Sequence, residues 1–170
     1  MGTDSKQKLS KILDIAEAIS VVGENSLLEG TVSYRLGRLG DYTKAPLKLY
    51  TKMREEKRKA IHEKQKALQK ETVGASEEVK REKSLEIQSL NEQFNTEVEA
   101  ILEQEEQISI PNLKLSDFLA KEERKTFETI GKNEDERKVE VIIKPGQALV
   151  PVRFFVLMGE LIVDDKDALK

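Results

Sequence analysis

The sequence lacks cysteine and tryptophan and has a single histidine among its 170 residues. Without cysteine it has neither disulfides nor thiolate chemistry, an absence that fits a cytosolic or virion protein. With no cysteine and only His62, we find no Cys–His or Ser–His–Asp set that predicts nucleophilic catalysis. No stretch reaches the roughly 18 apolar residues that a membrane-spanning helix needs. We therefore expect no enzymatic activity and no membrane partner.

Aromatic residues are scarce and charged residues are abundant. Charged residues make up 36% of the chain and hydrophobic ones 38%, whereas there are only five Phe and three Tyr. Because average proteins carry roughly 25% charged residues, this chain should bury a modest core and expose much helical surface. Its net charge of −3 argues against binding a polyanion through overall charge.

Two consecutive segments carry opposite charge. Residues 44–70 hold ten Lys or Arg against three Glu, a net +7, whereas residues 71–107 hold eleven Glu against three Lys or Arg, a net −8. Between them, Gly74 is suited to end one helix and Ser76 to cap the next. Nine apolar residues at helical spacing, called the seam below, run through both segments: Tyr50, Met53, Ile61, Leu68, Ile87, Leu90, Phe94, Val98 and Ile101. We predict that the two helices close antiparallel over this seam, each supplying the other's counter-charges.

The N-terminal region predicts further helices. Apolar residues at positions 9, 12, 13, 16 and 19 follow helical spacing, and Gly23 suits the left-handed cap of that helix. A second helical pattern begins near Leu27. Pro46 interrupts it, and because proline removes one intrahelical hydrogen bond we expect a kink or a break at residues 44–46.

The periodicity then changes to that of strands. Residues 107–115 and 138–146 each predict a strand, the second closed by a Pro-Gly turn, and we expect the two to pair antiparallel. Between them we expect a brief helix at residues 117–127, capped by Ser116, and a polar loop at 131–138.

The segment 150–163 is the most apolar, with ten apolar residues among its fourteen. It fits a helix or a strand, and Pro151 favours a helix because proline suits the first helical position. In either form the segment should need burial on all sides. We interpret it as core or, alternatively, as a subunit interface formed by Phe154, Leu157, Met158 and Leu161.

Together these patterns predict a mainly α fold, with an antiparallel, coiled-coil-like helical hairpin on a small α+β base. The expected organisation places N-terminal helices at residues 1–45 near the base, the hairpin at 46–107, and the base with its apolar segment at 108–170. A hairpin with so narrow a seam has no second apolar face to bury. It should therefore project into solvent or lie against a polar partner.

Residues of the types that bind small ligands do not form a recognisable set. His62 has no second histidine with which to share a metal, and we expect it at a solvated helix position. The pairs Glu82/Glu86 and Glu99/Glu103 have one-turn spacing, but a di-iron bundle also needs Glu-x-x-His motifs, and none occurs. We therefore predict neither a metal nor a cofactor.

The basic helix offers one alternative function. Lys57, Arg58 and Lys59 are consecutive, and such a run is able to follow a phosphate backbone. However, no aromatic residues alternate with them to stack on bases, and the acidic neighbouring segment would repel a polyanion. Nucleic-acid binding is therefore the less favoured interpretation.

Two segments resemble a known group of proteins. "VSYRLGRLGDYTK" at residues 32–44, before the long charged helix, resembles the helix start of small uncharacterised bacteriophage proteins with a long charged helical hairpin. "LNEQFNTEVEAILEQEEQISIPNLKLSDF" at 90–118 resembles their second helix and the Ile-Pro-x-Leu-x-Leu strand after it. This chain differs in lacking a proline just before Val32 and in a shorter turn near Gly74. The resemblance implies a phage context and no active residues.

From these features we expect a non-enzymatic structural or assembly protein, of a bacteriophage particle, that acts through self-association and subunit contacts. Its partners would be further copies of itself or other phage structural proteins. The alternative is an intracellular, phage-encoded binding module that acts on a host protein. The expected location is accordingly the virion or the host cytoplasm.

Overall fold

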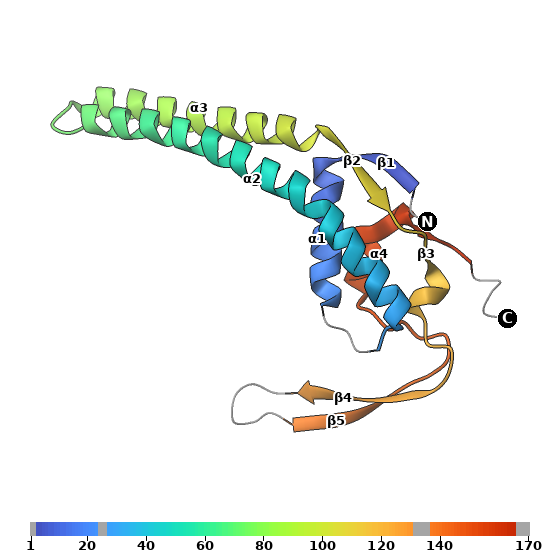
Figure 1. Ribbon diagram of the computed structural model, residues 1–170. Helices are drawn as coiled ribbons and strands as arrows, with labels where there is room; N and C mark the ends of the chain where they lie inside the picture. Colours follow the sequence, from blue (N-terminus) through green and yellow to red (C-terminus); the bar gives the residue numbers. More distant parts are fainter. Residues whose placement is uncertain (1–2, 24–26, 131–136, 166–170) are drawn as a thin grey trace. The chain divides into compact units, whose positions relative to one another are not determined.

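The computed structural model describes residues 3–23, 27–130 and 137–165 (Figure 1). Over these residues the protein is mainly helical with small two-stranded sheets, which confirms the predicted class at that level. The elements in chain order are β1 (Thr3–Lys8), α1 (Leu9–Val22), α2 (Gly30–Glu71), α3 (Glu77–Leu102), β2 (Glu105–Ile110), β3 (Leu113–Lys114), η1 (Leu115–Phe118), β4 (Arg124–Ile130), β5 (Arg137–Ile143), α4 (Val152–Met158), η3 (Gly159–Leu161) and β6 (Ile162–Val163).

The chain divides into two compact units. One, called the terminal unit, comprises Met1–Ser5, Asp14–Asp41 and Ser109–Lys170. The other, called the helical unit, comprises Lys6–Leu13 and Tyr42–Ile108. The helical unit therefore contains most of α2 and all of α3, whereas the terminal unit contains β3 to β6 and α4.

The core of the terminal unit is built around aromatic rings. Phe118 and Phe154 are fully buried, with ring centroids 4.8 Å apart, and Phe155 meets both edge-on at 6.2 and 5.6 Å. Such pairs contribute about 0.5–1.5 kcal/mol beyond the area that they bury. Three of the five Phe thus form this cluster, together with buried aliphatic residues that include Ile15, Leu39, Leu113 and Met158.

Helix α1 confirms the predicted N-terminal helix. Its buried residues recur every three or four positions: Leu9, Ile12, Ile15, Ala18 and Val22. Gly23 then adopts a φ of 53°, and its N–H donates to the carbonyl of Ile19 at 3.0 Å, as a left-handed cap requires. The preceding strand β1 was not predicted, because "TDSKQK" is polar throughout and offers no apolar alternation.

Helix α2 passes through Pro46 as one continuous element, so of the predicted kink or break at residues 44–46 the break does not occur. Proline removes one hydrogen bond and crowds the carbonyl of the preceding turn, but α2 has many turns on either side of it. Pro46 is itself buried, so apolar packing of its ring offsets part of that loss.

The turn between α2 and α3 follows the predicted chemistry. Gly74 adopts a φ of 77°, a region that favours glycine. Ser76 is the N-cap of α3, and its hydroxyl accepts a hydrogen bond from the N–H of Val79 at 3.5 Å. Glu77 and Glu78 occupy the first turn, where negative charge interacts favourably with the helix dipole.

The strands pair differently from the prediction. In the described residues β1 pairs with β2, β3 pairs parallel with β6, and β4 pairs antiparallel with β5 from Arg124↔Ile143 to Ile130↔Arg137. The expected pairing of 107–115 with 138–146 is therefore wrong. Strand β5 has a nearer partner in sequence, and neighbouring strands joined by a short connection pair most often.

The predicted helix at residues 117–127 is also wrong. The segment forms the single turn η1 and then strand β4, whose "RKTFETI" is rich in residues that favour strands. Ser116 does not cap a longer helix, because its hydroxyl and N–H both donate to Asp165, at 2.6 and 2.9 Å. Of the predicted polar loop, 131–136 lies outside the described residues, and 137–138 begin β5.

The apolar segment 150–163 is mostly helical. Pro151 is the N-cap of α4 rather than its first helical residue, and the chain continues through η3 into the short strand β6. The expectation of burial on all sides is wrong. Phe154 and Met158 are fully buried, whereas Val152 is 75% and Val156 73% exposed, because residues four apart share one face of a helix.

Candidate functional site

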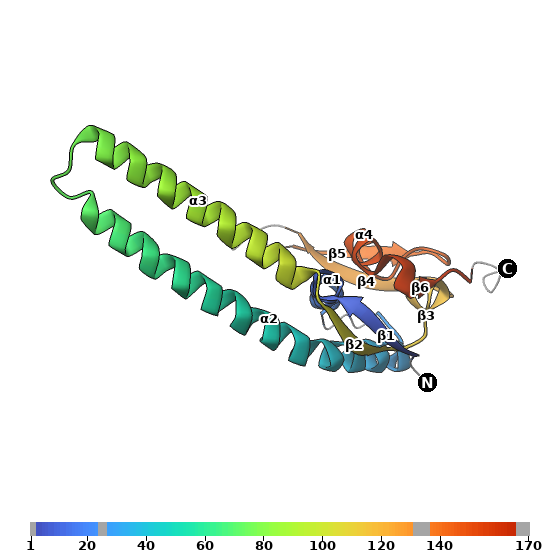
Figure 2. The same ribbon diagram turned by 90° about the horizontal axis from the view of Figure 1, so that it is seen from above.

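Helices α2 and α3 run alongside each other in both views (Figures 1 and 2). Three polar contacts join them. Lys57 pairs with Glu97 at 3.1 Å, Gln65 donates to Asn91 at 2.8 Å, and Glu71 pairs with Lys83 at 3.2 Å. From one contact to the next, the residue number on α2 rises while the residue number on α3 falls.

The seam residues lie on these two helices, and few of them are fully covered. Among the nine, Ile61 and Ile101 are buried. The other seven are partly exposed: Tyr50, Met53, Leu68, Ile87, Leu90, Phe94 and Val98. The described chain therefore leaves most of its seam in partial contact with water.

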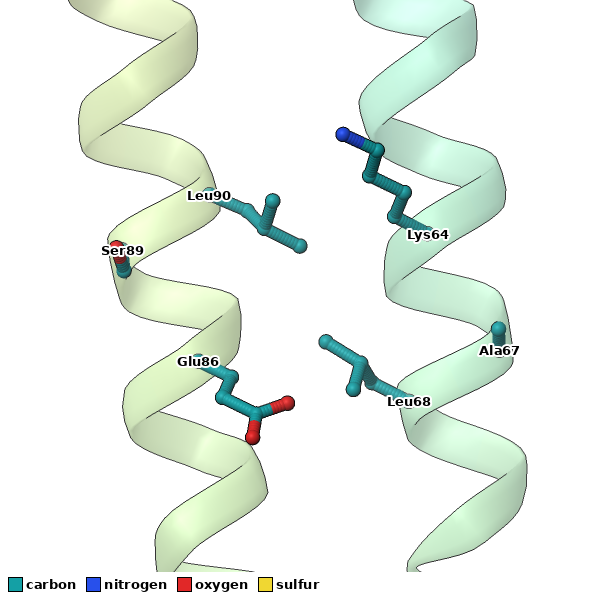
Figure 3. A pocket seen from close by; sticks show the side chains of 6 residues that line it. All are labelled: Lys64, Ala67, Leu68, Glu86, Ser89 and Leu90. Atoms are coloured by element: carbon teal, nitrogen blue, oxygen red, sulfur yellow. The ribbon is translucent and has the colours of Figure 1, made fainter.

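A cavity of about 470 Å³ lies between the two helices. Figure 3 shows Leu68 and Leu90 pointing toward each other from opposite helices, with Lys64 and Glu86 above and below them. Ala67 and Ser89 also line the cavity. Apolar spacing did not identify these two residues, because both are exposed and Figure 3 shows that their side chains do not point into the gap between the helices.

The basic run contributes to contacts within the chain. Hydrogen bonds from Lys57, and then from Gln93, lower the pKa of Glu97 below its ordinary value of 4.5. Lys57 is half-exposed and forms an ion pair with this carboxylate. Arg58 and Lys59 are exposed on the surface of α2. The structure does not present the three as one unengaged basic surface.

The acidic positions that invited a metal interpretation are engaged with lysines or exposed. Glu86 contacts Lys83, whose pKa is raised because it donates hydrogen bonds to Glu71 and Glu86, and Glu103 pairs with Lys8 at 2.5 Å. Glu82 and Glu99 are exposed. Over the described ranges no group of three or more His, Cys, Asp or Glu side chains is arranged to hold a metal ion. His62 is exposed and borders a small hollow beside Phe94.

The four residues considered as a subunit interface divide into two pairs. Phe154 and Met158 are fully buried in the protein's own core. Leu157 and Leu161 are partly exposed, and Leu161 lines a shallow hollow of about 370 Å³ together with Ile110, Pro111 and Val163. Only the second pair is therefore accessible to another molecule.

Strands β4 and β5 both carry exposed apolar residues. Phe127 on β4 is 67% exposed, and on β5 Ile142 is 48% and Val139 42% exposed. Lys125 and Glu140 form an ion pair across the two strands at 2.9 Å. The alternating Val and Ile residues were a sufficient signal for a strand, but not for its exposure.

Polar contacts fix the start of α2 to the segment around η1. Arg35 donates to the carbonyl of Asn112 at 2.7 Å and pairs with Asp117 at 3.0 Å. Hydrogen bonds from the hydroxyl and then the N–H of Ser116 lower the pKa of Asp165. These contacts hold the terminal unit together and present no open polar pocket.

Profiles of known protein families, curated proteins and solved structures were compared with the chain, and none matches it. Among the described helices, none combines the length and the apolar character needed to cross a membrane. The features that remain for a functional interpretation are the partly exposed seam, the shallow hollow at Leu161 and the exposed strand β5.

Proposed function

We propose that α2 and α3 form an antiparallel, coiled-coil-like hairpin, and that the protein is a non-enzymatic structural or assembly protein that acts by self-association. One observation carries this proposal: the apolar seam is only partly covered by the chain itself. Seven of its nine residues remain partly exposed, and a cavity of about 470 Å³ lies between Leu68 and Leu90.

The opposite order of the three polar contacts supports the antiparallel arrangement. Lys57, Gln65 and Glu71 of α2 contact Glu97, Asn91 and Lys83 of α3, and this order is what two antiparallel helices give. The charges select this partner, because the segment of net +7 lies along the segment of net −8.

Apolar burial supplies the driving force for association. Full burial of a Leu, Ile or Phe side chain stabilises by about 1.5–3 kcal/mol relative to exposure. The seam residues are only partly exposed, so a neighbouring subunit that covered them would gain part of that stabilisation. Leu157 and Leu161 in the terminal unit offer a second, smaller apolar contact.

The resemblance of residues 32–44 and 90–118 to bacteriophage proteins favours a phage particle as the setting. In that setting the partners are further copies of the protein or other phage structural proteins, and the location is the virion. The same open seam would equally accept a helix of a host protein. A phage-encoded binding module in the host cytoplasm is therefore the second candidate, and presence of the protein in purified particles distinguishes the two.

Nucleic-acid binding is disfavoured by the contact between Lys57 and Glu97. A phosphate that approached this lysine would have to compete with a carboxylate 3.1 Å away. Binding through phosphate contacts weakens steeply as the salt concentration rises. We expect this protein to show no such binding to duplex DNA.

Native mass spectrometry combined with light scattering tests the proposal. The expected result is an oligomer of defined copy number at tens of micromolar protein. A protein that stays monomeric over that range, and that captures no partner from phage-infected cells, would overturn the proposal.

A further inference from the structure

Strands β4 and β5 form a sheet of two strands. Each strand therefore has one edge without a hydrogen-bonded strand neighbour among the described residues. An isolated two-stranded ribbon is marginally stable in water, and an open edge is a template for pairing with another strand. Further strand pairing would stabilise this ribbon.

Both faces of the ribbon carry apolar side chains. The register places Phe127 opposite Glu140 and Lys125 opposite Ile142, so these four residues share one face. Val139 belongs to the other face, together with Val141 and Ile143, which are partly exposed. An exposed strand with apolar residues on both faces is typical of a site of strand addition.

We propose that β5 pairs antiparallel with β5 of a second copy of this chain, with Val139 opposite Val139 on the two-fold axis. The product is a four-stranded sheet in the order β4, β5, β5 of the partner, β4 of the partner. This interface deepens the self-association proposed above and rests on it, since it names one surface through which copies meet.

The charged residues of β5 favour a second copy of β5 as the pairing strand, and they favour one register of that pairing. With Val139 on the axis, Lys138 of each copy lies opposite Glu140 of the other, which gives two opposite-charge pairs. An axis through Lys138 would place lysine against lysine, and an axis through Glu140 would place glutamate against glutamate. An axis through Val141 gives no opposite-charge pair. The strand is thus complementary to itself in one register.

Glu140 already pairs with Lys125 of its own chain at 2.9 Å. In the four-stranded sheet it would lie between Lys125 and the Lys138 of the second copy, and all three side chains are on one face. Each carboxylate would then have a lysine on both sides. The like charges of the two copies, Glu140 with Glu140 and Lys138 with Lys138, would be diagonal neighbours and not directly opposite each other.

Strand β4 is the less suitable edge. Arg124, at its start, donates to the carbonyl of Leu27 at 2.8 Å and is already engaged within the terminal unit. β5 also contains more of the β-branched residues that favour strands, with Val139, Val141, Ile142 and Ile143 against two Thr and one Ile in β4. Pairing through β4 is an outcome that the experiment below detects.

A charge-reversal experiment tests the interface, using the full chain and sedimentation equilibrium. Lys138→Glu places glutamate against glutamate at both pairs, and Glu140→Lys places lysine against lysine. Each variant alone should associate on the order of tenfold more weakly than the wild type. A one-to-one mixture of the two variants should recover wild-type association, because both pairs again have opposite charges. Lys66→Glu, an exposed position on α2, is the matched control and should leave association unchanged.

Cysteine cross-linking provides a second readout, since the chain has no cysteine of its own. Directly opposite residues in antiparallel strands lie about 4.5–5.5 Å apart, within the range that a disulfide spans. Val139→Cys should therefore form a disulfide-linked dimer under mild oxidation. Thr126→Cys on β4 should not, because three strand spacings, about 14 Å, would separate the two copies.

The outcomes separate this inference from the proposed function. A wild-type protein that associates, with no recovery in the variant mixture and no cross-link at position 139, overturns the β5 interface and leaves self-association standing. A cross-link at 126 instead of 139 assigns the contact to β4 and likewise overturns it. A wild-type protein that remains monomeric overturns the β5 interface together with the self-association on which it rests.

Discussion

Lys57 Nζ on α2 lies 3.1 Å from Glu97 Oε2 on α3. The contact joins a segment of net +7 to one of net −8, and it is flanked by the contact between Gln65 and Asn91. A lysine of the basic stretch is therefore paired with a carboxylate of the same chain.

The pKa of Glu97 predicts an acid-sensitive step in the helical unit. This pKa is lowered in the folded protein, chiefly by Lys57 and then by Gln93. A carboxyl group with a lowered pKa stabilises the fold above its ordinary pKa of 4.5, and this stabilisation is lost as the pH falls through the lowered value. NMR titration of the Glu97 carboxyl should show a midpoint below 4.5 that Lys57→Ala moves upward. An unchanged midpoint in Lys57→Ala would show that the pair does not form in solution.

Asp165 gives a corresponding prediction for the terminal unit. Its carboxylate accepts hydrogen bonds from the hydroxyl and the N–H of Ser116, which lower its pKa from an ordinary value of 3.8. Ser116→Ala removes the hydroxyl and leaves the N–H, so the pKa should rise part of the way toward 3.8. Ser116→Thr keeps a hydroxyl and is the matched control. The account of this contact fails if Ala and Thr at position 116 give the same titration midpoint.

The aromatic cluster predicts a large difference between two positions of α4. Phe154→Ala should destabilise the terminal unit by about 3–5 kcal/mol, because it leaves a cavity beside Phe118. Val156→Ala, on the exposed face of the same helix, should change stability by less than about 0.5 kcal/mol. Hydrogen exchange of the terminal-unit amides measures both effects. Equal effects of the two substitutions would contradict the orientation of α4.

The sequence was sufficient to predict elements whose signals are local. Apolar residues at three- and four-residue steps predicted α1, and Ser76 and Gly74 predicted the boundary between the two long helices. Both signals depend on residues within a few positions of one another. Helix caps and amphipathic spacing therefore needed no knowledge of tertiary contacts.

Errors arose where tertiary contacts overrode local signals. The expected break at Pro46 did not occur, because α2 continues on both sides of a buried proline. Ser116 was expected to cap a helix, but it binds Asp165, forty-nine positions away in sequence. Once β4 was assigned to that helix, β5 was left without its true partner and was paired with the wrong segment.

The candidate surfaces were predicted in the same uneven way. Helical spacing identified the seam residues, but their incomplete burial depends on how the two helices lie against each other, which the spacing does not specify. In α4, composition alone did not separate the buried Phe154 and Met158 from the exposed Val152 and Val156. To make that distinction one must know which face of α4 packs against the core.

The measurement that tests self-association through the seam most directly is sedimentation velocity over a range of protein concentrations. Three proteins are compared: the wild type, Leu68→Asp within the seam, and Gln69→Asp at the adjacent exposed position of the same helix. We predict that the wild type and Gln69→Asp associate, and that Leu68→Asp associates at least about tenfold more weakly while circular dichroism shows unchanged helix content. Equal sedimentation of all three proteins, whether as monomers or as the same oligomer, would contradict this account.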